Sequence, residues 1–173
     1  MKQLNAYKKS LMVAAFSFFA VTGALAQFSI GAELAMPMST PFSDFAGIGI
    51  GGSAAYDGAI NDNLSWSGRV GYITFAGKSG NTYSTNIIPI TAGIKYYFTE
   101  SNAGFYGAGD LGMFMGSSSA PGSTSESKFG FAFGAGYRLT SIDISLKYNI
   151  ISYAGFDANN LGLRIAYVFG GSK

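Results

Sequence analysis

The side chains of this 173-residue chain that could do chemistry are mostly charged residues placed singly within apolar segments. Acid–base catalysis commonly uses histidine or a pair of carboxylates, and a nucleophilic serine or cysteine commonly needs a neighbouring histidine. The chain contains neither histidine nor cysteine, which excludes Ser–His and Cys–His arrangements, thiolate metal sites and disulfides. Paired carboxylates remain the catalytic option, and Glu33, Asp110 and Asp143 are the candidates.

A structural role for these carboxylates is favoured over a catalytic one. Nine charged residues lie well inside the segments that we predict below to be strands, and five of them are basic while four are acidic. Near balance favours ion pairs between neighbouring side chains, because unpaired charge in a narrow interior is costly. We therefore expect a structural ion-pair network and no catalytic, metal or cofactor site. Its predicted members are Glu33, Asp57, Arg69, Lys95, Asp110, Arg138, Asp143, Lys147 and Arg164.

The first 26 residues have the three parts of a signal peptide. Met1–Ser10 carries three lysines and no acid, Leu11–Leu25 is apolar, and Ala24-Leu25-Ala26 gives the small-x-small pattern of a cleavage site. About 15 apolar residues is short for a retained anchor helix, so cleavage is favoured. We predict a signal peptide at 1–26 and a single domain at 27–173, whose eight basic and nine acidic residues do not suggest a nucleic-acid partner.

After the signal peptide, apolar residues alternate with small or polar ones. A period of two is typical of a strand whose two faces meet different environments. In the clearest segment, Ile142, Ile144 and Leu146 alternate with Asp143 and Ser145. No apolar run after residue 26 approaches the roughly 20 residues of a membrane-spanning helix. The pattern predicts eight strands, at 28–36, 47–60, 64–76, 85–98, 104–116, 128–139, 142–153 and 160–169.

The side-chain types indicate which face of these strands points outward. All nine strand charges lie on the face opposite to the bulky apolar residues, and the charged face is rich in small residues such as Gly49, Gly51 and Ser53. The interior of an eight-stranded barrel is just wide enough for side chains to fill, so the crowded apolar face fits outside. In lipid, strands must close on themselves to satisfy their backbone groups. We predict an all-β fold, an eight-stranded antiparallel up-and-down transmembrane barrel with a plugged polar lumen.

The connections and the aromatic residues also fit an outer-membrane barrel. Connections of about 10, 8, 11 and 6 residues alternate with connections of about 3, 5 and 2 residues, as external loops alternate with periplasmic turns. Pro89 in the fourth strand cannot donate to the ladder, so we expect a local bulge there. Aromatic residues of the apolar face gather near the periplasmic ends, where they would form a girdle: Phe28, Trp66, Tyr96, Phe98, Phe105, Tyr137, Tyr167 and Phe169.

These features together resemble the family of small outer-membrane β-barrels of the OmpA and OmpX type. The resemblance rests on the signal peptide, the glycine–aromatic alternation, the eight strands and a last strand of the form Leu161-x-Leu163-x-Ile165-x-Tyr167-x-Phe169. It implies a bacterial outer-membrane location, contact with outer-membrane lipid, and recognition of Tyr167 and Phe169 by the barrel-assembly machinery during insertion. The family usually ends on the aromatic residue, whereas four residues follow here, too few for a periplasmic domain.

Several functions remain open at the level of sequence. The leading hypothesis is a plugged barrel that acts as a structural or surface-recognition scaffold through its external loops. The alternative is a narrow porin-like channel for ions or small solutes, because a glycine-lined inner face is less filled. A loop-based adhesin, with a surface ligand of unknown identity, or an outer-membrane enzyme is less favoured. The first loop carries four large apolar residues, which could form an apolar binding surface or fold down onto the barrel rim: Met36, Met38, Phe42 and Phe45.

Overall fold

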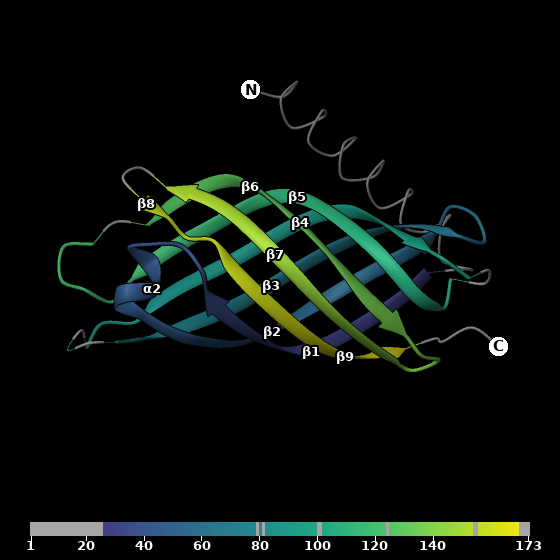
Figure 1. Cartoon of the computed structure of the whole chain (residues 1–173), viewed down its shortest axis with the longest axis horizontal. Coiled ribbons are helices and arrows are strands. Elements are labelled where there is room, and N and C mark those ends of the chain that lie inside the picture. The colour runs from purple at the N-terminus through teal and green to yellow at the C-terminus, as the bar shows by residue number, and fades with distance from the viewer. Residues whose placement is uncertain are drawn as a thin grey trace, which may run out of the picture.

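The chain folds into a closed antiparallel β-barrel (Figure 1). The computed structural model describes residues 26–78, 80, 82–99, 102–123, 125–153 and 156–169, so the predicted signal peptide, apart from Ala26, and the last four residues lie outside the described residues. The elements in chain order are β1 (Ala26–Pro37), α2 (Phe42–Phe45), β2 (Ala46–Ala59), β3 (Leu64–Gly77), β4 (Thr85–Tyr97), β5 (Gly104–Ser118), β6 (Glu126–Arg138), β7 (Ile142–Tyr153), β8 (Phe156–Asp157) and β9 (Asn160–Phe169).

Eight long strands form the barrel, and the predicted fold class is confirmed. Each long strand pairs antiparallel with its neighbours in the chain, and β9 pairs with both β7 and β1, which closes the sheet. The short strand β8 pairs only with the end of β7. The observed strand ends lie within two residues of the predicted ones, because the alternation that predicts a strand stops where the backbone turns.

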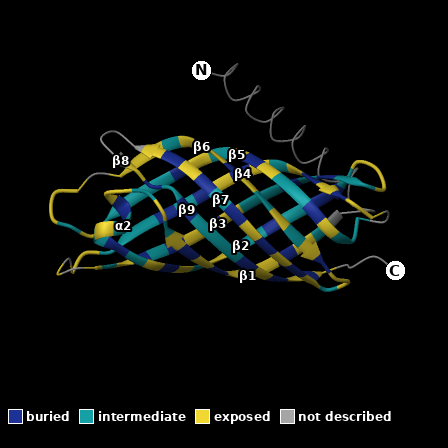
Figure 2. Cartoon of the chain, in the orientation of Figure 1, coloured by how far each residue is buried: buried dark blue, intermediate teal, exposed yellow. Residues whose placement is uncertain are grey.

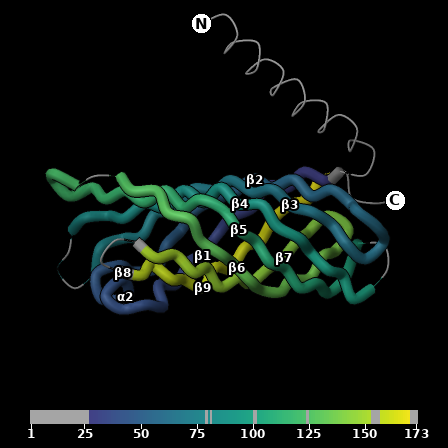
Figure 3. The backbone as a smooth tube through the Cα atoms, turned by 90° about the horizontal axis from the view of Figure 1, so that it is seen from above, coloured from purple at the N-terminus to yellow at the C-terminus, as the bar shows by residue number. Residues whose placement is uncertain are grey.

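The two ends of the barrel differ, as Figures 1 and 3 show. The turn end carries the connections at 60–63, 98–103 and 139–141, and the loop end carries α2, β8 and the longer connections. At the turn end, Oδ1 of Asn61 accepts hydrogen bonds from the backbone N–H groups of Asn63 (3.0 Å) and Leu64 (2.8 Å). This side-chain contact closes a tight turn, the conformation for which asparagine is suited.

Exposed and buried residues alternate along every strand (Figure 2). In β7, Ile144 and Leu146 are exposed, whereas Asp143, Ser145 and Lys147 are buried. Large apolar side chains are exposed around the whole outside of the barrel, which confirms the predicted assignment of the two faces. No helix among the described residues is both long and apolar enough to cross a membrane.

Aromatic side chains on the outer face pack together near the turn end. Phe105 and Tyr137 have ring centroids 4.6 Å apart, and the centroids of Phe28 and Phe169 are 5.9 Å apart. Such pairs cover the sheet where the strands meet the turns, in the position of the predicted girdle. Rings on one strand also meet, as Tyr167 and Phe169 do at 4.9 Å.

The bulge predicted at Pro89 is wrong. The pairs Val70↔Ile90 and Ile73↔Ile87 share one register, so no residue is inserted, although the pairing of β3 with β4 is interrupted between them. Pro89 is buried in the interior. It has no N–H group to donate to the ladder, but the register of β4 does not change there. The register shift lies instead between β2 and β3, next to Gly49, where a Cβ atom would come within 2.6 Å of the Phe75 ring.

Candidate functional site: the barrel interior

Four charged side chains form a closed group inside the turn end, which we call the quartet: Asp57, Lys95, Arg138 and Asp143. Nζ of Lys95 lies 2.9 Å from Oδ2 of Asp57 and 3.2 Å from Oδ2 of Asp143. Nη2 of Arg138 contacts the same two oxygens at 2.5 and 2.8 Å. Each cation therefore bridges both carboxylates, and the two positive and two negative charges balance.

Tyrosine hydroxyl and ring groups complete the surroundings of the quartet. The hydroxyl of Tyr106 donates to Oδ1 of Asp143 at 2.7 Å, and Nζ of Lys95 lies 5.0 Å from the centroid of the Tyr106 ring. Tyr97 packs on Tyr106, with ring centroids 5.1 Å apart. Because Asp57 and Lys95 come from β2 and β4, their contacts with Asp143 and Arg138 of β7 and β6 cross the lumen. The contacts of Lys95, Arg138 and the Tyr106 hydroxyl with the two carboxylates are charge-assisted hydrogen bonds, the stronger class of such bonds.

The other five predicted residues lie in the middle of the barrel. Lys147 donates a hydrogen bond to Asp110, and these two form one ion pair. Oε1 of Glu33 lies between two arginines, 3.5 Å from Nη1 of Arg69 and 3.8 Å from Nε of Arg164. These five residues are called the middle group below, and the structure places all nine predicted residues in the interior.

Serine hydroxyls accept the hydrogen bonds that Arg164 does not donate to Glu33. Nε of Arg164 donates to Oγ of Ser53 at 2.8 Å, and its Nη2 donates to Oγ of Ser29 at 3.0 Å. Both serines face inward, Ser53 from β2 and Ser29 from β1, and both lie across the β1–β9 seam from Arg164. The small inward residues predicted from the sequence therefore leave the space in which the long arginine side chain lies.

The candidate catalytic carboxylates Glu33, Asp110 and Asp143 each lie against a cation. Among the described residues, no group of three or more acidic side chains is placed to hold a metal ion. The arrangement of these carboxylates is that of charge neutralisation, since each of them lies beside Lys or Arg side chains.

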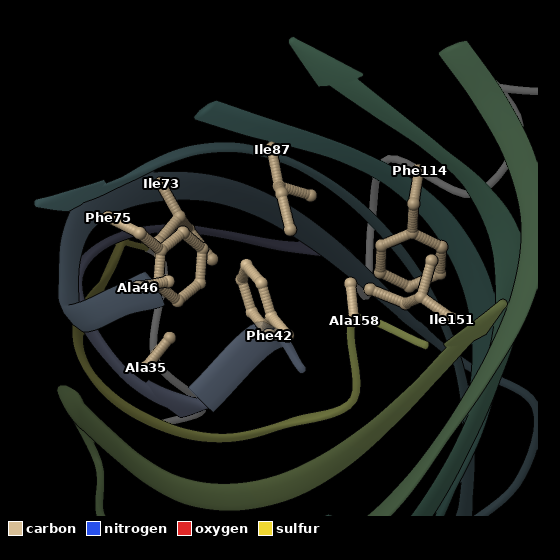
Figure 4. Packing of buried hydrophobic residues seen from close by; sticks show 9 residues of the cluster. All are labelled: Ala35, Phe42, Ala46, Ile73, Phe75, Ile87, Phe114, Ile151 and Ala158. Carbon is tan, nitrogen blue, oxygen red and sulfur yellow. The ribbon is translucent and has the colours of Figure 1, made fainter. Parts of the chain in front are cut away.

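The loop end of the interior is apolar, which sequence reasoning missed. Phe42 of α2 is fully buried inside the barrel mouth, and its ring centroid lies 5.1 Å from that of Phe75 (Figure 4). We call this cluster the apolar cap: Ala35, Phe42, Ala46, Ile73, Phe75, Ile87, Phe114, Ile151 and Ala158. The sequence does contain a pattern that predicts the apolar cap. The inward positions at the loop ends of β3, β4, β5 and β7 carry large apolar residues in place of charges.

Hydrogen bonds hold α2 in the mouth. Oγ of Ser39 donates to the carbonyl of Asp157 at 2.5 Å and accepts from the N–H of Asn159 at 2.9 Å, which ties the first loop to the chain before β9. On the other side, the N–H of Lys78 donates to the carbonyl of Phe45 at 2.9 Å. Of the two alternatives for the first loop, the inward fold holds for Phe42, whereas Met36 and Met38 stay half exposed.

Two small cavities separate the three layers of the interior. One lies between the apolar cap and the middle group, and the other lies between the middle group and the quartet. Each has a volume of about 10 Å³, which is room for about one water molecule. Arg69 lines both cavities.

A closed eight-stranded barrel with an apolar outside and a charged inside defines the class of small membrane barrels. The model of the outer membrane protein beta-barrel domain family matches residues 10–169, and the chain belongs to this family. It is accordingly a protein of the bacterial outer membrane, and its outer face contacts lipid. No curated protein matches the chain.

Solved structures of small outer-membrane barrels share this fold. The attachment invasion locus protein Ail of Yersinia pestis matches with a TM-score of 0.58 and 19% identity, over 83% of this chain and 97% of that chain. The N-terminal barrel domain of Pseudomonas aeruginosa OprF matches with a TM-score of 0.53 and 13% identity, over 83% of this chain and 97% of that chain. Neisserial surface protein A matches with a TM-score of 0.51 and 15% identity, over 83% of this chain and 94% of that chain. At these identities the likeness shows the fold alone.

Proposed function

We propose that this outer-membrane barrel is a structural or surface-recognition scaffold, with a sealed lumen and with its loop end facing the outside of the cell. The observation that carries the proposal is the position of Phe42, which is fully buried among interior side chains of β3, β4, β5 and β7. A phenyl ring from an external loop thus occupies the lumen where a solute would have to enter.

The layers below the cap also support a sealed lumen. In the quartet, each cation contacts both carboxylates, and an ion passing through the lumen would have to break these contacts. The cavities on either side of the middle group are each about the size of one water molecule, which does not give a continuous aqueous path. The barrel then serves to hold its loops at the membrane surface.

The charges at the loop end bear on what these loops would bind. Ail has been crystallised with sucrose octasulfate, a heparin analogue. Here the described loop end carries two lysines, Lys78 and Lys128, together with three acidic residues, Asp44, Glu126 and Asp157. A sulfated polyanion needs clustered positive charge. We therefore propose a surface ligand that is contacted by apolar and hydroxyl groups, such as the half-exposed Met38 and Tyr83.

The strand β9 supports the proposed route of assembly. Tyr167 and Phe169 lie on its outer face at the turn end, about half exposed, and would present the signal that the barrel-assembly machinery reads. No enzymatic step is part of the proposal, because each candidate carboxylate lies against a cation.

Single-channel conductance tests the sealed lumen. Mature protein is refolded in detergent, selected for the shift in gel mobility on boiling that marks a folded barrel, and inserted into planar bilayers. Silence across many insertions is the expected result. Steady, ion-selective current steps that change in Asp110→Asn or Arg164→Gln protein would refute the sealed scaffold and favour the narrow channel.

A further inference from the structure

The interior of the barrel carries one positive charge that its own carboxylates do not balance. In the described part of the chain, the quartet is neutral and the pair of Lys147 with Asp110 is neutral. What remains is Glu33 between Arg69 and Arg164, two cations for one anion. An uncompensated charge in a membrane-spanning interior destabilises the fold, so a counter-ion at this level would stabilise it.

Arg69 is the cation whose hydrogen-bonding groups are least satisfied. Within the described residues, its Nε has no hydrogen-bond partner, and neither has Oε1 of Glu33, its nearest carboxylate oxygen. The contact between these two side chains is 3.5 Å long, beyond the usual range for an N–H···O bond between charged groups. Arg164, in contrast, donates to two serines. The side chain of Arg69 is only 11% exposed, so bulk solvent reaches little of it.

The cavity beside Arg69, on the side of the quartet, is rich in hydrogen-bond donors. Four cationic side chains line it, and the hydroxyls of Ser67 and Ser145 line it as well. Asp57 is the one carboxylate in the lining; its Oδ2 contacts Lys95 and Arg138, and its Oδ1 has no hydrogen-bond partner among the described residues. Converging donors around a small volume are the chemistry that binds an anion. The cationic residues of the lining are Arg69, Lys95, Lys147 and Arg164.

We propose that this cavity binds one monovalent anion of halide size, which is chloride in the cell. Its single negative charge would bring the interior to neutrality. A volume of about 10 Å³ accommodates about one water-sized particle, which excludes sulfate, phosphate and organic anions without rearrangement. The bound halide is a structural ion that links the middle group to the quartet, and it supplies Nε of Arg69 with an acceptor. The inference concerns the interior alone and does not depend on what the loops recognise.

Bromide is the probe for the site, because it resembles chloride and scatters anomalously. The mature barrel is refolded and crystallised in sodium bromide, and anomalous diffraction is measured at the bromine edge. We expect an anomalous peak inside the barrel within contact distance of Arg69 and Lys147. The peak should be lost in Arg69→Gln and kept in Lys128→Gln, which removes a cation at the rim of the loop end. An interior without an anomalous peak in the unaltered protein would overturn the proposal.

The unfolding temperature in solution gives a second readout that needs no crystal. The temperature at which the folded band is lost from gels is measured in sodium chloride and in sodium gluconate at equal ionic strength. For an ion that binds only the folded state, the stabilisation grows with the logarithm of its concentration above the dissociation constant. We expect such a rise with chloride for the unaltered protein and for Arg69→Lys, which keeps the charge, but none for Arg69→Gln. Equal unfolding temperatures of the unaltered protein in both salts would contradict a halide site, and occupancy by water would give that result.

Discussion

Replacing Asp143 with asparagine should strongly destabilise the barrel, although the two side chains have nearly the same shape. Asp143 is fully buried and is contacted by Lys95 at 3.2 Å, by Arg138 at 2.8 Å and by the hydroxyl of Tyr106 at 2.7 Å. In the variant, Lys95 and Arg138 share only Asp57, and one positive charge of the quartet is uncompensated. The side-chain amide also has one acceptor oxygen in place of two, so it cannot accept from both the cations and the Tyr106 hydroxyl with separate oxygens as the carboxylate does.

The expected loss is about 3–5 kcal/mol in the free energy of unfolding, the usual cost of removing one partner of a buried ion pair. The contacts agree with this size, since hydrogen bonds to charged groups contribute roughly 1.5–3 kcal/mol each and are not additive. Trp66 is the only tryptophan of the chain and lies on the outer face near the turn end, so its fluorescence reports release from lipid. Unfolding is followed in urea with the protein refolded into lipid vesicles, and the transition midpoints and slopes are compared.

Asp157→Asn is the matched control, because Asp157 is exposed at the loop end and the substitution removes the same charge. It should change the free energy of unfolding by less than about 0.5 kcal/mol. Adding Lys95→Met to Asp143→Asn restores the charge balance of the quartet, so the double variant should be more stable than the sum of the two single losses predicts. If Asp143→Asn lost no more stability than Asp157→Asn, the quartet would not be an energetically coupled network.

Three further substitutions test other parts of the structure. Leu163→Arg places a charge on the lipid face and should cost about 2–4 kcal/mol in the same urea assay, more than Leu163→Ala; equal costs would contradict the inside-out assignment. Phe42→Ala should cost up to about 3–5 kcal/mol if the apolar cap cannot collapse, and Met38→Ala, in the same loop but half exposed, should cost little; similar losses would mean that the cap is not a packed core. Phe169→Ala should slow insertion assisted by the barrel-assembly machinery without lowering stability to the same degree, and an unchanged insertion rate would remove the proposed signal.

The faces of the strands could be predicted from sequence because the physical cause is local. Successive side chains of a strand point to opposite faces, so the positions of Asp143 and Ile144 already separate lumen from lipid. The same parity assigns Arg164 to the lumen and Leu163 to the lipid. Strand ends follow from the alternation in the same way, and closure follows from the requirement that lipid leaves no backbone group unpaired.

Two ion pairs, Arg138 with Asp143 and Glu33 with Arg164, join residues directly opposite on neighbouring strands. The partners that lie on strands that are not neighbours could not be predicted, because they are set by the tilt and stagger of the strands. Lys95 of β4 contacts Asp143 of β7, yet these two strands are not neighbours in the sheet. In the register of β2 with β3, Asp57 lies opposite Ser67, which gives no hint of its two cations. Such contacts cross the lumen and depend on how far each strand is shifted along the barrel, which period-two patterning does not encode.

The position of Phe42 depends on loop conformation, which has no comparable period. The first loop could have turned its aromatic residues outward, and what distinguishes the two arrangements is the apolar lining that receives Phe42 inside the mouth. That lining comes from the consecutive strands β3, β4 and β5 and from β7, and the contribution of β7 joins the others only when the barrel closes. The inward position of Phe42 could be predicted only from the observation that inward-facing charges stop before the loop ends of the strands.

The ionic and apolar parts of the interior differ in how well they tolerate amino-acid substitutions. A buried ion network loses several kcal/mol when one member is removed, because a charge is left without a partner. An apolar core accepts many substitutions that keep its volume. The charged layers lie toward the turn end and in the middle, and the apolar cap lies beneath the external loops. Loop residues and the cap can therefore change together, while the charged layers keep the barrel folded, which is the property that a scaffold for surface recognition requires.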